Sequence, residues 1–176
     1  NRATNTMRQP GSTFKILAAY APALDAAGVS LTDVYLDAPF NYNNGKPVGN
    51  WYGESYRGIQ NVRQGIADSL NIVAVKTITQ ITPQLAFDYL TNFGFTTLIE
   101  REVRNDGTVY SDINQSIALG SPTYGVTNME LNAAYASIAN GGVYIEPTLY
   151  TKILDNEGNV LIDKTVPESH RVIQES

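Results

Sequence analysis

The sequence predicts an α+β fold that is mainly helical and carries a β-hairpin near its C-terminal end. Several segments repeat apolar residues at helical spacing between residues that begin and end helices. Near the end, two apolar segments flank the turn sequence DNEG. Hydrophobic residues make up 43% of the 176 residues and charged residues 16%, which is typical of a single globular domain with a sizeable core.

The first helix is expected over residues 12–28, directly after Pro10 and Gly11. It is apolar nearly all round, which is typical of a buried helix. Pro22 lacks an amide N–H and should kink this helix or split it in two. Helical patterns return over residues 60–68 and 72–80, with the triplet Ser-Leu-Asn between them.

Two further helices have clear boundary signals. One begins with Thr82 as N-cap and Pro83 at the first helical position, and it ends at Gly94. The other begins at Thr127, where Glu130 completes a capping box, and it ends at residues 141–142. The strands of the predicted hairpin cover residues 148–154 and 159–163.

Residues 37–58 form a long segment that is rich in Asn, Gly, Pro and Tyr. A loop of this length inside a compact domain is usually functional or mobile. Trp51 within it either lines the entrance of a cleft or anchors the loop to the core, and we favour the anchor. The loop is therefore a candidate for part of the site.

Composition excludes several classes of function. The net charge of −5, with no cluster of Lys and Arg, argues against a nucleic-acid surface. The absence of cysteine excludes disulfides, thiolate catalysis and cysteine-bound metals. No cofactor is predicted. His170, the only histidine, lies in a polar segment and is interpreted as a surface residue, and the acidic stretch 100–106 is interpreted as solvated.

The longest apolar run, residues 16–24, is too short to span a bilayer. The chain starts at Asn1 and shows no signal peptide, so we expect it to be a piece of a longer protein. Any membrane anchor of that protein would lie outside this sequence.

Ser12 and Lys15 are the first candidates for chemistry. On a helix, residues three apart share one face, so the two side chains would lie about one turn apart. A serine hydroxyl needs a neighbouring base to act as a nucleophile, and a lysine can be that base if burial lowers its pKa. Alternatively, Ser12 is only an N-cap and Lys15 extends along the surface towards solvent.

Ser69 and Asn71 form the only Ser-x-Asn in the chain and stand at a junction between helices. A hydroxyl there can pass a proton, and an amide can bind a peptide carbonyl. The alternative is that Asn71 caps the helix that starts at residue 72, which is compatible with the first interpretation.

Together these motifs resemble the signature of penicillin-recognising serine enzymes, which add a third element, Lys-Thr-Gly. The segments RQPGSTFK, GIADSLNIVAVK and IALGSPTYGVTNMELNAAYASIANGGVYIEP are similar to the transpeptidase domain of penicillin-binding proteins, most of all the bifunctional class A kind. The similarity runs over nearly the whole chain. It implies a β-lactamase/transpeptidase-like fold, with residues 1–176 forming part of the domain: its mainly helical portion plus the hairpin.

The resemblance also implies a reaction. Ser12 would attack the carbonyl of a peptidoglycan stem peptide ending in D-Ala-D-Ala, and an amine of a neighbouring stem would then take up the acyl group. Lys15 would be the general base, Ser69 would pass a proton to the leaving amine, and Asn71 would hold the substrate amide. β-Lactam antibiotics would acylate Ser12. The parent protein would act at the extracytoplasmic face of the bacterial membrane.

The third motif does not occur in the sequence. Residues 76–78 and 164–166 begin with Lys-Thr, but each triplet has a β-branched residue where the family has glycine. Such a residue would obstruct a substrate lying against the strand backbone, so we reject both triplets. Because the family's oxyanion hole also uses a backbone N–H of that strand, we expect the isolated chain to be impaired as a catalyst.

The motifs must also be compared with three alternative functions. A β-lactamase would need a carboxylate for deacylation, and its Glu-x-x-x-Asn arrangement is absent from the sequence. A D,D-carboxypeptidase and a non-catalytic cell-wall scaffold both stay open at this point.

Overall fold

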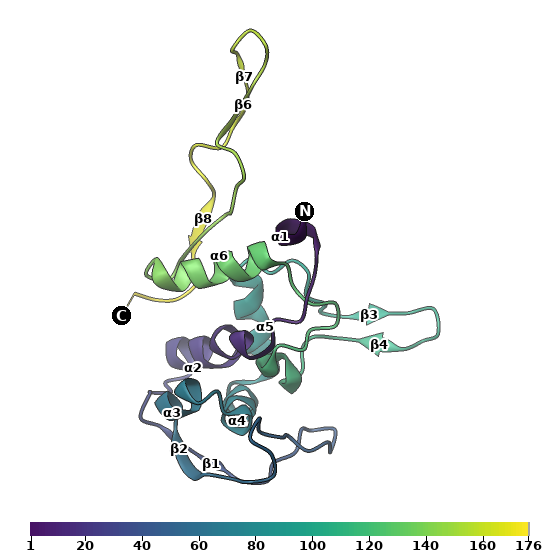
Figure 1. The fold of residues 1–176 in the computed structure, drawn as a ribbon, viewed down its shortest axis with the longest axis vertical. Helices are drawn as coiled ribbons and strands as arrows, with labels where there is room; N and C mark the ends of the chain where they lie inside the picture. Colours follow the sequence, from purple (N-terminus) through teal and green to yellow (C-terminus); the bar gives the residue numbers. More distant parts are fainter. Residues whose placement is uncertain (176) are drawn as a thin grey trace.

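A computed structural model describes residues 1–175, in which a helical body carries four small sheets (Figure 1). The α-helices are α1 (Arg2–Asn5), α2 (Ala21–Ala26), α3 (Val62–Ala67), α4 (Asn71–Ile81), α5 (Pro83–Asn92) and α6 (Asn128–Ala139). Two 3₁₀ helices, η1 (Gly11–Thr13) and η3 (Gln115–Leu119), and one π-helical segment, η2 (Ile16–Tyr20), complete the helical part.

The predicted first helix is one continuous helical run whose winding changes along η1, η2 and α2. Pro22 lies in the first turn of α2, and the turn before it widens so that the Ala21 N–H donates to the Ile16 carbonyl. Because Pro22 has no N–H, the regular helical ladder cannot run through it. Residues 11–26 stay helical without a break, so the expected split at Pro22 is not found, and the residues before the proline instead form a π-helical turn.

This helical run forms the centre of the hydrophobic core. Segment η2 and α2 pack against α4 and α5, and η2 is almost completely buried. Phe14 packs edge-to-face on Phe95 with ring centroids 5.0 Å apart. Leu90 and Phe93 of the α5 region are also fully buried. The chain therefore holds the segment next to Ser12 in a fixed place.

Helices α5 and α6 follow their predicted boundaries. The Thr82 side chain accepts a hydrogen bond from the Leu85 N–H, and α5 ends just before Gly94. The capping box of Thr127 and Glu130 is complete at the start of α6. Glu130 also accepts from the Thr96 N–H at 2.8 Å, so the cap ties α6 to the segment after α5.

The four sheets are antiparallel pairs of strands. Strands β6 and β7 are the predicted hairpin, with shorter strands, and Figure 1 shows it projecting far from the helical body. The other three pairs were not predicted. The pairs are β1 (Val34–Asp37) with β2 (Gly58–Asn61), β3 (Glu102–Val103) with β4 (Val109–Tyr110), β5 (Val143–Ile145) with β8 (Ser169–Arg171), and β6 (Lys152–Leu154) with β7 (Val160–Asp163).

The helix predicted over residues 60–68 is wrong at its start. Residues 58–61 pair with β1, and the helix begins only at Val62. The Asn61 side chain caps it by accepting from the Gln64 N–H. The loop between β1 and β2 covers residues 38–57, so the predicted long loop is confirmed and is closed at its base by the strand pair.

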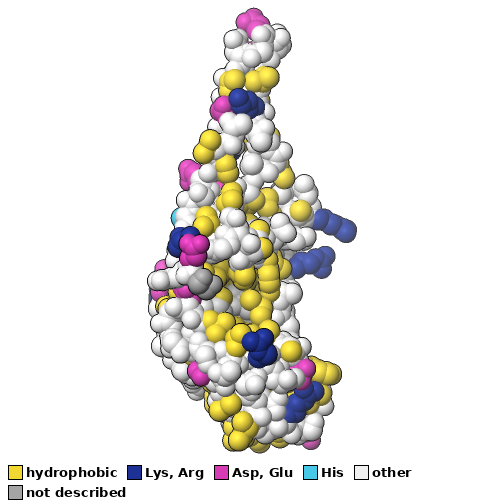
Figure 2. All heavy atoms as spheres, turned by 90° about the vertical axis from the view of Figure 1, so that its left-hand side faces the viewer, with side chains coloured by type: hydrophobic (Ala, Val, Ile, Leu, Met, Phe, Trp, Pro, Cys, Tyr) yellow, Lys and Arg dark blue, Asp and Glu magenta, His cyan; other side chains and the backbone are white. Residues whose placement is uncertain are grey.

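Apolar side chains are exposed at many places, among them Val34 and Ile59 of the β1–β2 pair and several residues of the projecting hairpin. Figure 2 shows them in the middle of one face and along the projecting hairpin. A cavity of about 430 Å³ is lined mainly by apolar residues, Ile16, Tyr20, Leu24, Ile66, Ile138 and Ile173 among them. Within residues 1–175 no helix combines the length and apolar character needed to cross a membrane.

Candidate active site

Lys15 is the centre of the site. It lies between η1 and η2, with only 2% of its surface exposed. Its ammonium nitrogen donates to the Ser69 carbonyl at 2.6 Å, to the Ser69 hydroxyl at 2.9 Å and to Asn71 Oδ1 at 2.6 Å. The structure thus brings three of the four predicted site residues into direct contact.

The surroundings of Lys15 favour the neutral amine. Burial lowers the pKa of Lys15 from 10.5 to about 8. In the described part of the chain no carboxylate forms an ion pair with it, and its three partners are neutral oxygens. A lysine with such a pKa is partly deprotonated close to neutral pH and can accept a proton.

Ser69 occupies the turn between α3 and α4 in a left-handed conformation, with φ of +54°. This conformation is uncommon for a residue with a side chain and is costly unless the surroundings impose it. Here it directs both the carbonyl and the hydroxyl of Ser69 to Lys15. The strained backbone of Ser69 therefore lies at the contact between the Ser12–Lys15 motif and the Ser69–Asn71 motif.

Asn71 is the first residue of α4, and its side chain does not cap the helix. Its Oδ1 accepts from Lys15, and its Nδ2 donates to the Gly49 carbonyl at 2.7 Å. The interpretation of Asn71 as an N-cap is wrong, because the acceptor for the first N–H groups of α4 is supplied by Asn50 of the long loop. Asn50 Oδ1 accepts from the Asn71 N–H at 3.0 Å and from the Ile72 N–H at 3.3 Å.

Asn50 belongs to a buried polar network that sequence reasoning missed. Its Nδ2 donates to Asp37 Oδ1 at 2.7 Å and to the Tyr52 hydroxyl at 2.8 Å. Asp37 is completely buried and also accepts from the Tyr52 hydroxyl and from the Arg57 N–H. Burial and the hydrogen bond to Asp37 raise the pKa of Tyr52 to about 12, so its phenol stays a donor. The network fixes the loop against the start of α4.

The composition of residues 37–58 pointed to this loop as functional, but it gave no signal for which of its many polar residues would be buried. Asp37 closes β1, and Asn50 lies deep in the loop. Only the pairing of β1 with β2 brings the start of the loop next to its end.

Ser12 lies in η1, exposed to solvent, three residues before the buried Lys15. Its hydroxyl forms no hydrogen bond with any residue in the described range 1–175, so contact with Lys15 is not made in this structure. The segment is held from the other side, because the Gly11 N–H donates to the Gly120 carbonyl at 3.2 Å. A side chain on Gly120 would meet the Gly11 carbonyl oxygen at 2.1 Å.

Trp51 does not anchor the loop to the core, since 66% of its surface is exposed. Its indole N–H donates to the Asp68 carbonyl at 2.9 Å, directly before Ser69. The Asp68 carboxylate in turn pairs with Arg57. The favoured interpretation of Trp51 is therefore wrong, and the residue instead lies on the surface beside the Ser69 turn.

The two rejected triplets lie outside any central strand. Residues 76–78 are inside α4, where Lys76 donates to the Leu36 carbonyl at 2.7 Å, and residues 164–166 follow β7. His170 is exposed in β8, with Nε2 2.8 Å from the Asn92 carbonyl oxygen. Among the residues that the structure describes, no cluster of three or more His, Cys, Asp or Glu could hold a metal ion.

The sequence of the whole chain matches the family model described as "Penicillin binding protein transpeptidase domain", over residues 1–176. Among curated proteins, penicillin-binding protein 1A of Streptococcus oralis is 33% identical over 168 residues, which is 90% of this chain and 24% of that protein. Penicillin-binding protein 1A of Escherichia coli is 30% identical, over 93% of this chain and 18% of that protein. The chain thus spans about a quarter or less of the length of these relatives.

Solved structures agree with this result. A crystal structure of penicillin-binding protein 1A from Haemophilus influenzae is 32% identical, with a TM-score of 0.71 over 93% of this chain and 23% of that one. PonA1 of Mycobacterium tuberculosis in complex with penicillin V is 25% identical, with a TM-score of 0.78 over 97% of this chain and 44% of that one. The fold is that of penicillin-binding protein transpeptidases, as the resemblance implied. The chain belongs to the penicillin-binding protein transpeptidase family, and its curated relatives are class A proteins of the 1A type.

Proposed function

We propose that residues 1–176 are part of a D,D-transpeptidase domain that cross-links peptidoglycan stem peptides through an acyl-enzyme on Ser12. The observation that carries the proposal is the buried Lys15, whose pKa is lowered to about 8 and whose amine contacts both Ser69 and Asn71. This is the surrounding that a lysine base needs, and it lies one helical turn from an exposed serine.

In the acylation step, Ser12 Oγ attacks the carbonyl carbon between the two terminal D-alanines and gives its proton to the neutral Lys15 amine. The new C–O bond forms a tetrahedral intermediate, which collapses as the C–N bond breaks. The departing D-alanine takes a proton through the Ser69 hydroxyl, which lies 2.9 Å from Lys15 Nζ. The Asn71 carboxamide holds the backbone amide of the donor peptide.

The number of hydrogen bonds on Lys15 fits this proton path. A charged ammonium donates three hydrogen bonds and accepts none, and Lys15 has three acceptors. After loss of one proton, two N–H donors suffice for the Ser69 carbonyl and Asn71 Oδ1. The lone pair is then left to accept the proton of Ser12. The regained third N–H donates to the Ser69 hydroxyl, which passes a proton on to the leaving amine.

In the second step, an amine of a neighbouring stem peptide attacks the acyl-enzyme and regenerates Ser12. A β-lactam ring would acylate the same hydroxyl and block this step. A related structure supports this ligand class, because PonA1 of Mycobacterium tuberculosis was solved in complex with penicillin V, a β-lactam.

We further propose that the complete protein is anchored in the bacterial membrane and acts on its extracytoplasmic face, as expected for a cell-wall enzyme. The sequence contains no Lys-Thr-Gly triplet. The isolated 176-residue chain would therefore lack one donor of the oxyanion hole and turn over poorly.

The test is a cross-linking assay on the complete protein with a D-Ala-D-Ala donor peptide and an amine acceptor. We expect release of D-alanine together with a cross-linked product, and loss of both in Ser12→Ala. The exposed Ser55 supplies the matched control, and Ser55→Ala should keep full activity. Hydrolysis without cross-linking would instead identify a D,D-carboxypeptidase, and unchanged turnover in Ser12→Ala would refute the assignment of the nucleophile.

A further inference from the structure

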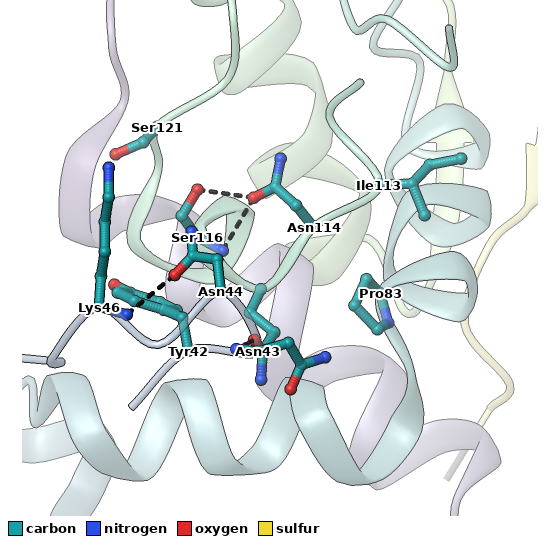
Figure 3. Close-up of a pocket in the computed structure, with 10 residues that line it drawn as sticks. Tyr42, Asn43, Asn44, Lys46, Pro83, Ile113, Asn114, Ser116 and Ser121 are labelled. Atoms are coloured by element: carbon teal, nitrogen blue, oxygen red, sulfur yellow. Dashed lines mark hydrogen bonds between the residues drawn. The ribbon is translucent and has the colours of Figure 1, made fainter. Parts of the chain in front are cut away.

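A cavity of about 740 Å³ lies between the long loop and the segment around η3 (Figure 3). The long loop contributes Tyr42, Asn43 and Lys46 to its wall, and the segment around η3 contributes Asn114 and Ser121. The mechanism proposed above uses none of these residues. The cavity is therefore a separate feature that needs its own explanation.

Both walls of the cavity continue directly into the catalytic motifs. On one side Ser121 follows Gly120, whose carbonyl accepts from the Gly11 N–H, and Gly11 precedes Ser12. On the other side, Tyr42 packs on the cluster that contains Val48, and the next residue, Gly49, accepts from Asn71 Nδ2. A peptide whose end reaches Ser12 and Asn71 would thus find this cavity next along its path.

Part of the polar lining is committed to the fold. Buried Gln115 accepts from the Asn43 N–H at 2.7 Å and donates to Thr79 of α4 at 2.6 Å. Asn114 accepts from the backbone and hydroxyl of Ser116 and donates to the Ser111 carbonyl. These bonds hold the loop and η3 together and leave the two residues with little capacity for a ligand.

Four of the other polar groups of the lining are free and can donate. Within the described residues, Lys46 Nζ, the Ser121 hydroxyl, the Tyr42 hydroxyl and the Asn43 carboxamide form no hydrogen bond or ion pair. Figure 3 shows the amine of Lys46 pointing towards the Ser121 hydroxyl. Lys46 is the only charged residue of the lining, in a chain with a net charge of −5. One cation among neutral donors suits a carboxylate, which only accepts hydrogen bonds.

From this arrangement we propose that the cavity binds a carboxylate-bearing stretch of the stem peptide, with Lys46 and Ser121 as its main partners. The proposal rests on the function proposed above and adds a specificity site to it. The carboxylate can belong to the acyl donor or to the amine acceptor, and the two steps of the reaction separate these sources.

The test compares three acylating probes on the complete protein: benzylpenicillin, a D-Ala-D-Ala peptide with one carboxylate upstream of the terminal pair, and the same peptide with that carboxylate amidated. Lys46→Glu should lower acylation by the carboxylate peptide about tenfold, because it replaces attraction by repulsion in a partly exposed site. Acylation by benzylpenicillin and by the amidated peptide should stay within about twofold of the wild-type rate. Ser121→Ala should show the same pattern more weakly.

Lys152→Glu, on the projecting hairpin, is the matched control and should change none of these rates. If the selective loss occurs only when a carboxylate-bearing amine attacks the acyl-enzyme, the site serves the acceptor. If Lys46→Glu discriminates in neither step while benzylpenicillin still acylates Ser12, the cavity proposal is overturned and the transpeptidase proposal survives. If benzylpenicillin acylates no variant and not the wild type, both proposals fail.

Discussion

Lys15 shows how one residue acquires its chemistry from its surroundings. Its side chain is buried, and its partners are the carbonyl and hydroxyl of Ser69 and the carboxamide oxygen of Asn71. These dipoles satisfy the N–H groups without holding a full counter-charge close by. Burial therefore determines the direction of the shift and lowers the pKa of Lys15 to about 8.

The pKa of Lys15 leads to a prediction for the pH dependence of acylation. In the proposed mechanism only the neutral amine accepts the Ser12 proton, so the rate should rise with pH up to about 8 and then level off. Below that value it should fall by about tenfold for each pH unit. The measurement is the second-order rate of acylation by benzylpenicillin across this range.

Two variants control that profile. Lys15→Arg should lose acylation at every pH, since a guanidinium does not release its proton, whereas Lys76→Arg should keep the wild-type profile. A flat profile in the wild type between pH values of about 6 and 8 would contradict the role of Lys15 as general base.

At the residue scale, the two motifs can be seen in the sequence, whereas the residues that hold them in place cannot. Ser12, Lys15, Ser69 and Asn71 stand at spacings that show in the sequence. Asp37 and the loop residues around Asn50 have no such spacing, because their contacts depend on how a 20-residue loop closes. Asp37 is buried only because the folded loop packs over it, and no local sequence pattern shows this.

At the scale of elements, too, features with local sequence signals were predicted and features that depend on distant contacts were not. Helices α5 and α6 were predicted because their caps are local, with Thr82 before Pro83 and Thr127 paired with Glu130. Strands β1 and β2 were missed because their apolar residues, such as Val34 and Ile59, are exposed and show no buried alternation. Strand β5 pairs with β8 across more than 20 residues, and no local signal marks that partner.

Contact between η1 and the residue after η3 gives a prediction at this scale. Gly120 has φ of +71°, and an added Cβ would lie 2.1 Å from the Gly11 carbonyl oxygen. Gly107 has a similar φ of +82° but open space around it. Gly107→Ala should therefore cost only the backbone strain, about 1–2 kcal/mol, and leave acylation intact.

Gly120→Ala should cause the same backbone strain and, in addition, a clash between the new Cβ and the backbone of Gly11, the residue before Ser12. We expect a larger loss in the free energy of unfolding and at least about a tenfold drop in acylation rate. Chemical denaturation and benzylpenicillin acylation measure the two effects. Equal behaviour of the two alanine variants would show that the Gly11–Gly120 contact does not position Ser12.

At the scale of the whole molecule, the helical body brings together segments that are far apart in sequence. Lys15 meets Ser69 and Asn71 across more than 50 residues, and the loop 38–57 closes over the start of α4 (Figure 1). The core of η2, α2, α4 and α5 supports all of these contacts. We propose that this body presents Ser12 as a nucleophile activated by Lys15.

An intact-mass spectrum after incubation with benzylpenicillin tests whether Ser12 is activated in this way. It is recorded for the complete protein, for Ser12→Ala and for the Ser55→Ala control. We predict one covalently bound drug molecule in the wild type and in Ser55→Ala, and none in Ser12→Ala. An adduct that persists in Ser12→Ala, or no adduct in the folded wild type, would contradict the account.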